Sequence, residues 1–144
     1  MRTHKLQTIL QNAADNFCLA ITYLYLVLHH DADDTEKGML EPAVASMLVM
    51  AANDEEVLDE DGFVKDAEKL IFRCTGKKVS VTKNDDITSV KELPKDTYSA
   101  VRFDYNNKSH WVGFLGDKFL YNSLDFSNCF SYGKPTAARI LKFN

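Results

Sequence analysis

Three kinds of side chain occur in the order that a thiol-based hydrolytic site requires. Cys18 opens a long apolar run, His110 opens an apolar strand, and Asn122 and Asp125 lie on the strand that follows. At the start of a helix, free backbone N–H groups and the positive end of the helix dipole stabilise a thiolate and lower the pKa of the thiol. A histidine can take the thiol proton and return it to a leaving group, while a third residue fixes its tautomer. The pattern therefore indicates nucleophilic catalysis by Cys18.

The third residue depends on the register of a predicted hairpin around Gly116-Asp117. Side chains on neighbouring strands share a face only when their pairing has the right parity. If the turn has two residues, Asp125 lies on the face of His110 and Asn122 points away. If the loop has three residues, the parity shifts and Asn122 joins the face of His110. The residues alone leave both arrangements open.

Other chemistry-bearing residues have structural interpretations. Free cysteines are often small buried hydrophobes, which is the alternative for Cys18 and the expectation for Cys74 and Cys129. An exposed Cys129 would be the main rival nucleophile, although no predicted helix start activates it. His29 and His30 lie at a predicted helix end, where the dipole favours a protonated imidazole, and we expect them to be structural.

An acidic segment runs from Asp54 to Asp61. Part of it, with Gly62 and Glu68, resembles a calcium-binding EF-hand loop, but Val57 stands at the first ligand position and cannot bind calcium. The segment is therefore expected to form an acidic turn that caps the following helix. The three cysteines include no Cys-x-x-Cys pair, so we expect no zinc site and no other metal.

Composition limits the remaining function classes. The 144 residues fit one domain, 1–144, at the usual ~100–200 residues each. A net charge of −4 lacks the basic footprint of a nucleic-acid binder. The longest apolar run, 17–28, is too short to cross a bilayer, and no signal peptide is evident. We expect a cytoplasmic protein with no membrane or nucleic-acid partner.

The hydrophobic period predicts helices first and strands last, which is an α+β fold with a helical N-terminal half and a C-terminal antiparallel sheet. Helices are expected at 6–10, 17–28, 40–52 and 64–74, with Asp15-Asn16 as a cap and Gly76 as a stop. Strands are expected at 79–82, 98–105, 111–115, 119–121 and 138–143.

Three segments resemble those of papain-like cysteine peptidases. Asn16-Phe17-Cys18-Leu19-Ala20 resembles the nucleophile motif, and His110-Trp111-Val112 with Tyr121-Asn122-Ser123-Leu124 resembles the histidine strand and the strand after it. The stretch 58–68 is similar to the acidic turn and third helix of small phage-associated members. The resemblance covers about Leu10 to Lys142 and implies a papain-like fold.

The resemblance also implies roles for individual residues. Cys18 would be the nucleophile, His110 the base and then the acid, and Asn122 the residue that orients His110, with Asp125 in reserve. These peptidases usually carry a glutamine about six residues before the cysteine to bind the oxyanion; here that position is Asn12, with Gln11 beside it. No cofactor is implied, and the partner is a peptide or protein substrate.

Two other hypotheses differ in class from a hydrolase. The chain could be a non-catalytic papain-fold binding protein, such as a phage-borne factor that engages a host protein, or a structural domain with inert cysteines. A large exposed apolar patch away from Cys18 would favour the binding protein.

Overall fold

The structure, a computed structural model, describes residues 17–123 and 128–144. Most helices precede the strands, and the predicted α+β class is confirmed. The helices of the described part are α2 (Cys18–Asp31), α3 (Leu40–Ala51), α4 (Ala67–Thr75) and α5 (Asn128–Tyr132), with 3-10 turns η1 (Lys37–Met39) and η2 (Val90–Glu92). The strands are β1 (Val79–Asn84), β2 (Tyr98–Tyr105), β3 (Lys108–Leu115), β4 (Lys118–Tyr121) and β5 (Lys134–Phe143).

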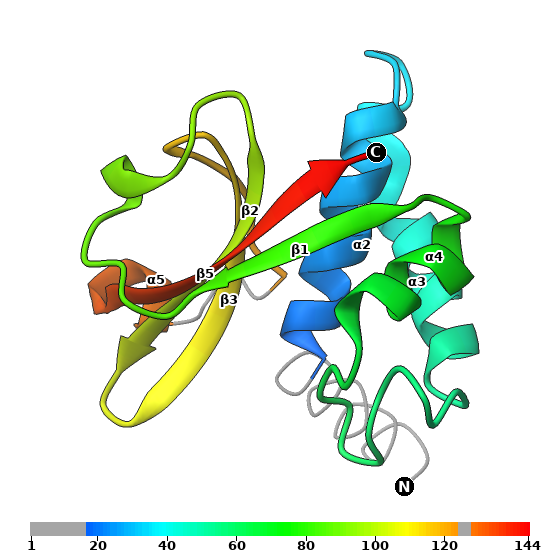
Figure 1. Ribbon diagram of the computed structural model, residues 1–144, viewed down its shortest axis with the longest axis horizontal. Helices are drawn as coiled ribbons and strands as arrows, with labels where there is room; N and C mark the ends of the chain where they lie inside the picture. The colour runs from blue at the N-terminus through cyan, green and yellow to red at the C-terminus, as the bar shows by residue number, and fades with distance from the viewer. Residues whose placement is uncertain (1–16, 124–127) are drawn as a thin grey trace, which may run out of the picture.

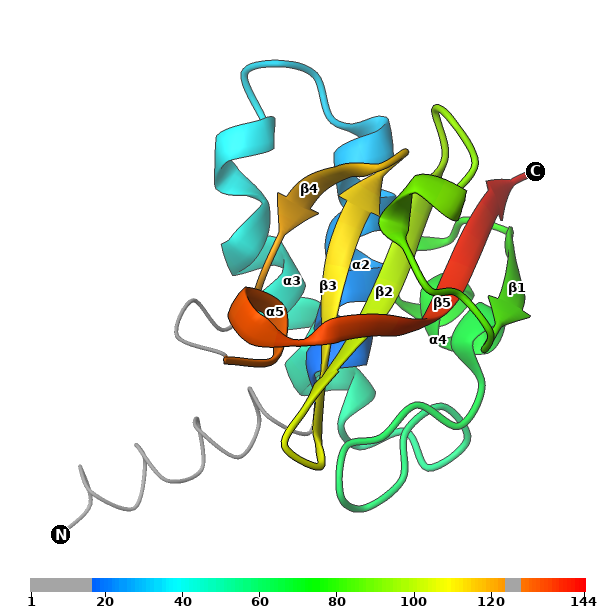
Figure 2. The same cartoon turned by 90° about the vertical axis from the view of Figure 1, so that its left-hand side faces the viewer.

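The strands form one sheet in the order β1-β5-β2-β3-β4, and every neighbouring pair is antiparallel. Helices α2, α3 and α4 lie on one side of this sheet, and α5 lies on the other (Figures 1 and 2). Each side has its own core. The larger core joins the helices to the sheet, and the smaller one lies under α5 and η2. The sheet is therefore buried on both faces along its centre.

Helix α2 is the central element, as its apolar sequence predicted. Its buried residues lie all round the helix rather than on one stripe: Cys18, Ala20, Thr22, Tyr23, Leu24, Leu26 and Val27. It packs closely on β3 because Gly113 has no side chain, so that a Cβ there would lie 3.0 Å from Leu26 Cδ2. In the described part of the chain, no helix combines the length and apolar character that a bilayer span requires.

Helix α4 begins later than predicted. Val64 forms an isolated bridge with Leu58, and the helix starts at Ala67 because the side chain of Asp66 accepts a hydrogen bond from the N–H of Lys69 at 3.0 Å. The acidic turn therefore does not cap this helix, since Asp66 does. Its C-terminal end agrees with the prediction: Gly76 adopts the left-handed conformation with φ 75°.

Strand β3 is longer than predicted. The polar residues Asn106 and Asn107 have φ of 49° and 64° and form a tight two-residue turn between β2 and β3. Lys108 and Ser109 consequently belong to the strand, and His110 is its third residue rather than its first. The residues before and after His110 are all paired with β2, so the backbone that carries the imidazole is held within the sheet.

Candidate active site

The β3–β4 hairpin decides which residue accompanies His110. Its turn at Gly116-Asp117 has two residues, because Leu115 pairs with Lys118. Phe114 then pairs with Phe119, but Gly113 pairs with Tyr121, so the register shifts by one residue. This β-bulge reverses the parity that the turn alone would set.

Asn122 therefore shares the face of His110, although the turn is the short one. The His110 Nε2 and Asn122 Oδ1 atoms are 2.6 Å apart. An amide oxygen can only accept, so Nε2 donates its hydrogen. In a neutral imidazole with that tautomer, the lone pair that can take up a proton is on Nδ1. Asp125, the other candidate, lies outside the described residues.

Helix α2 runs alongside β3 in the same direction. His29 contacts Tyr98, which is paired with Leu115, and Tyr25 stacks on Tyr121, which is paired with Gly113. One helical turn earlier, Thr22 Oγ1 lies 3.5 Å from the carbonyl oxygen of Trp111.

The spacing of these contacts fixes the level of Cys18. Four helical residues rise about 6 Å and two strand residues about 6.6 Å, so each turn of α2 advances two residues along β3. Cys18 lies one turn before Thr22, and the same step brings it level with Ser109 and His110. The start of α2 and the imidazole of His110 are therefore neighbouring parts of the molecule.

His110 lies on a part of β3 that forms the edge of the sheet. Successive side chains of a strand point to opposite faces of the sheet. Trp111 packs on the face that α2 covers, so His110 and Val112 lie on the other face, where Val112 belongs to the core beneath α5. In the described residues, β4 pairs with β3 only from Gly113 onward. In the described residues, the edge of β3 beside His110 is therefore not covered by β4, and this edge lies between the face of His110 and the side on which α2 packs.

Cys18 is the first residue of α2, as an activated thiol requires. Phe17 precedes the helix without a side-chain cap, and the hydroxyl of Thr22 donates to the Cys18 carbonyl at 2.7 Å. The ring of Phe17 lies over Gly62, which brings the acidic turn against the helix start. Cys18 is only 5% exposed and His110 only 3%, so a reactant can approach them over a small area.

Two arginine side chains contact Trp111, the residue after His110, and the sequence alone did not identify them. The Cζ atoms of Arg139 and Arg102 lie 5.0 and 5.9 Å from the ring centroid of Trp111, within cation–π distance. Arg102 lies directly across from Trp111, and Arg139 on β5 is held by Asp85 at 2.7 Å. These contacts fix the residue beside His110. They depend on pairing between distant strands, which no local pattern reveals.

The remaining cysteines agree with the structural interpretation. Cys129 is 6% exposed and packs in the core beneath α5 with Phe103 and Phe114, so the alternative of an exposed rival nucleophile does not apply. Its thiol is turned inward by a short helix, α5, that the sequence did not predict. Cys74 is half-buried between α3 and α4, and burial, followed by the charge of Asp54, raises the pKa of its thiol.

The histidines at the C-terminal end of α2 have structural partners. His29 Nδ1 lies 2.8 Å from the hydroxyl of Tyr98, and the ring of His30 stacks on Phe143 with centroids 3.7 Å apart. Burial, then the positive charge of Lys37, lowers the pKa of His29. These contacts agree with the structural interpretation of both histidines.

The acidic turn uses its carboxylates within the turn. Asp59 Oδ1 accepts hydrogen bonds from the N–H groups of Asp61 and Phe63, both at 2.9 Å. Among the residues described, no group of three His, Cys, Asp or Glu side chains is arranged to hold a metal ion. Asn12 and Gln11, the candidate oxyanion donors, lie outside the described residues.

Comparison with known proteins gives no family. The chain matches no protein-family model, and no curated protein or solved structure shows significant similarity to it. The geometry around Cys18, His110 and Asn122 is therefore the basis for assigning a function to this protein.

Proposed function

We propose that the protein is a cysteine hydrolase with a papain-like arrangement of Cys18, His110 and Asn122, which cleaves a peptide or amide bond. The observation that carries this proposal is the short hydrogen bond between the buried His110 and Asn122. It gives the imidazole the tautomer whose basic nitrogen is Nδ1, and the register of α2 against β3 brings the thiol to the same level. A structural histidine requires neither feature.

The reaction follows from these roles. Nδ1 of His110 takes the Cys18 proton, and the thiolate attacks the carbonyl carbon to form a tetrahedral oxyanion. The first N–H groups of a helix have no intrahelical acceptor, so those of α2 are suited to receive this charge. The imidazolium then protonates the leaving amine as the C–N bond breaks. A water molecule, deprotonated by His110, cleaves the thioester and regenerates the thiol.

Alkylation with iodoacetamide, followed at each cysteine by mass spectrometry, tests the pair without a known substrate. An ordinary thiol with a pKa of ~8.5 is less than about 1% thiolate at pH 6. We expect Cys18 to react much faster than Cys74 and Cys129 at this pH, in spite of its burial. His110→Ala should abolish the difference, and Asn122→Ala should reduce it. Equal slow reaction of Cys18 in the parent and in His110→Ala, with both folded, would refute the proposal.

A non-catalytic binding protein is the second candidate, and one observation favours it. Helix α3 and the 3-10 turn η1 before it expose large apolar side chains at Met39, Val49 and Met50, which are 73%, 70% and 75% exposed. None of these residues is among the contacts that surround Cys18 and His110 in the described part of the chain. A pulldown with an immobilised peptide cannot decide between the two functions, whereas the alkylation profile can.

A further inference from the structure

Helix α3 has an apolar composition that its position does not explain. Its twelve residues, LEPAVASMLVMA, include one charged side chain, Glu41. A helix that is apolar on all sides is normally buried. Here the buried residues are confined to Leu40, Val44 and Ala51, and the opposite side of the helix faces outward. An exposed apolar helix face of this kind indicates a surface that another molecule covers.

A groove continues this surface between α3 and α4. It measures about 130 Å³ and is lined by five apolar residues and one ion pair, namely Met47, Met50, Ala51, Val57 and Cys74 with the paired Asp54 and Arg73. The Cys74 sulfur lies 3.9 Å from the carbonyl oxygen of Met47, and the two charged groups of the lining, Asp54 and Arg73, neutralise each other in an ion pair. Methionine side chains adapt to the shape of what they contact. The groove is suited to one apolar anchor from a partner.

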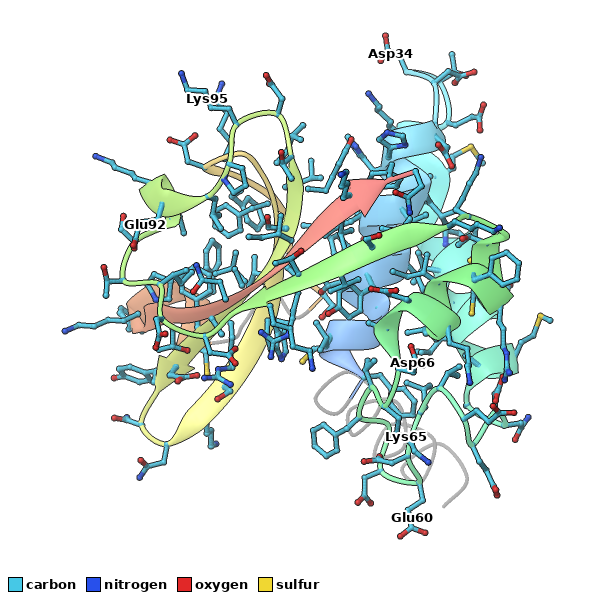
Figure 3. All side chains as sticks on the ribbon, viewed as in Figure 1. Asp34, Glu60, Lys65, Asp66, Glu92 and Lys95 are labelled. Atoms are coloured by element: carbon cyan, nitrogen blue, oxygen red, sulfur yellow. The ribbon has the colours of Figure 1, made fainter. Side chains whose placement is uncertain are left out.

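Acidic residues lie at both ends of α3. The segment 31–61 contains 11 of the 21 acidic residues of the chain and one of its 17 basic residues. Figure 3 shows Asp34 at one end of the helical layer and Glu60 at the other. Any partner of the apolar face must therefore bring compensating positive charge near both ends.

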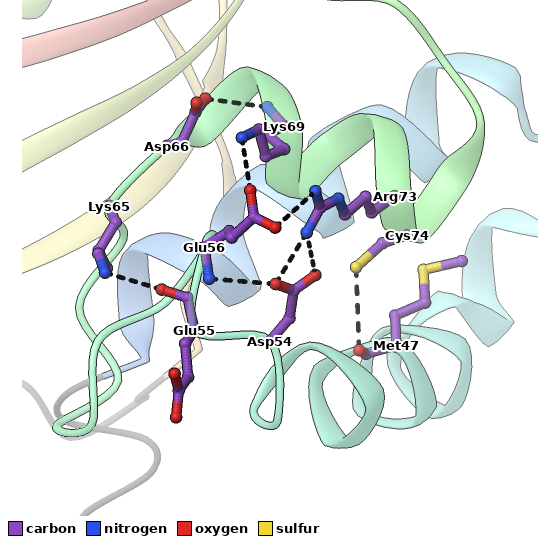
Figure 4. A network of polar contacts seen from close by, with 9 residues as sticks. All are labelled: Met47, Asp54, Glu55, Glu56, Lys65, Asp66, Lys69, Arg73 and Cys74. Carbon is purple, nitrogen blue, oxygen red and sulfur yellow. Dashed lines mark hydrogen bonds and ion pairs between the residues drawn. The ribbon is translucent and has the colours of Figure 1, made fainter.

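Only part of this acidic charge is neutralised within the protein. Arg73 and Lys69 of α4 bind Asp54 and Glu56, as Figure 4 shows, with Arg73 Nη1 2.7 Å from an Asp54 oxygen. Among the described residues, no ion pair reaches seven other carboxylates of the segment: Asp33, Glu36, Glu41, Glu55, Asp59, Glu60 and Asp61. Helix α4 thus holds Asp54 and Glu56 in place, while the carboxylates without an ion pair give the surroundings of the apolar face a strong negative potential.

We propose that α3, with the groove beside α4, binds a basic amphipathic helix of a partner protein. The exposed face extends along about 18 Å of helix, which matches about three turns of a second helix. The partner would carry apolar residues toward Met47 and Met50, with lysine or arginine near both ends. A second copy of this chain would bring two acidic segments together, and nucleic acids and anionic membranes carry the same sign of charge.

The chain supplies its own reporters for this surface. Three of its four methionines, Met39, Met47 and Met50, lie at or beside α3. The probe is a Leu/Lys peptide of about 18 residues with an amphipathic helical pattern. Titration into protein with ¹³C-labelled methionine methyl groups should shift the signals of Met47 and Met50. A peptide of the same composition in scrambled order, and a Leu/Glu peptide with the same pattern, should not shift them.

A matched pair of variants locates the binding. Met50→Glu should weaken binding of the Leu/Lys peptide at least about tenfold, because it places a charge at the apolar contact. Tyr132→Glu, on α5, changes an equally exposed side chain of 71% exposure and should leave affinity unchanged. Raising the salt concentration from about 50 to 300 mM should weaken binding several-fold, as expected for exposed charges.

Four results would overturn the proposal: no methyl shift, equal shifts with the scrambled peptide, equal shifts with phosphatidylcholine vesicles, or self-association that Met50→Glu abolishes. The vesicle result would indicate a lipid surface, and the last an interface between copies of the chain. Neither Met50 nor Tyr132 belongs to the candidate active site. Cysteine alkylation in both variants therefore tests the hydrolase separately from this surface.

Discussion

Gly62 connects the acidic turn to the start of α2, and its replacement by alanine tests that connection. Gly62 and Gly76 both have positive φ, 98° and 75°, a region that side chains disfavour. At Gly76 no atom lies within 4 Å of the position of a Cβ. At Gly62 the ring of Phe17 occupies that position, with Cδ2 2.6 Å away. The two glycines therefore differ in steric surroundings while sharing backbone strain.

The expected losses of unfolding free energy follow from this difference. A left-handed conformation costs about 1–2 kcal/mol for a residue with a side chain, which applies to both variants. Forcing a methyl group into occupied space typically adds about 1–3 kcal/mol. We expect Gly76→Ala to lose ~1–2 kcal/mol and Gly62→Ala ~2–5 kcal/mol in urea unfolding.

A double-mutant cycle identifies the cause. If the ring of Phe17 is the obstacle, Gly62→Ala in a Phe17→Ala background should cost no more than Gly76→Ala. Because Phe17 precedes Cys18, Gly62→Ala should also change the rate of Cys18 alkylation, whereas Gly76→Ala should not. Equal losses for the two alanine variants, or a cost at Gly62 that persists without the ring, would refute the packing that we describe.

Three further predictions concern single contacts. Asn122→Ala should lower the free energy of unfolding by about 1–3 kcal/mol, measured in urea, because it removes the Nε2 partner of a buried imidazole. The pKa of His29 is lower in the folded protein than in the unfolded chain, so below about pH 6.5 the unfolded state binds more protons than the folded state. The contribution of His29 to stability is therefore fully present above about pH 6.5 and is lost as the pH falls. The urea midpoint should therefore decrease below that pH, and His29→Gln should reduce the decrease. Asp66→Ala should cost ~1 kcal/mol through loss of the α4 cap, whereas Asp66→Ser should retain most of the stability in the same assay.

Elements with a strong local pattern could be predicted from the sequence. The apolar run before His29 is a buried helix, and Tyr98 to Tyr105 form a strand with the predicted bounds. Element ends were less predictable, because single side chains set them: Asp66 delays α4, and Asn106-Asn107 lengthens β3. Helix α5 has only five residues and depends on burial against the sheet, so no local period marks it.

The partner of His110 could not be predicted because two features determine the parity of the hairpin. Turn length alone favours Asp125, and the bulge reverses this in favour of Asn122. Lys118 is followed by the apolar residues Phe119, Leu120 and Tyr121, so the strand lacks the polar–apolar alternation that would locate an extra residue. The decisive information is the pairing with β3, which is a property of the folded sheet.

The two proposals depend on different parts of the helical layer. Helix α2 contacts β3, α3 and α4, whereas the exposed residues of α3 lie on the side opposite to its buried residues Leu40, Val44 and Ala51. A helix bound at Met50 would lie on the outside of α3 and leave the sheet edge at His110 uncovered. A partner held there can therefore stay bound while a bond is cleaved, so catalysis and docking need not compete. If peptide binding instead slows alkylation of Cys18, the effect must be transmitted through α2. Variants of Leu26, a buried residue of α2, should then change how strongly peptide binding affects the alkylation rate.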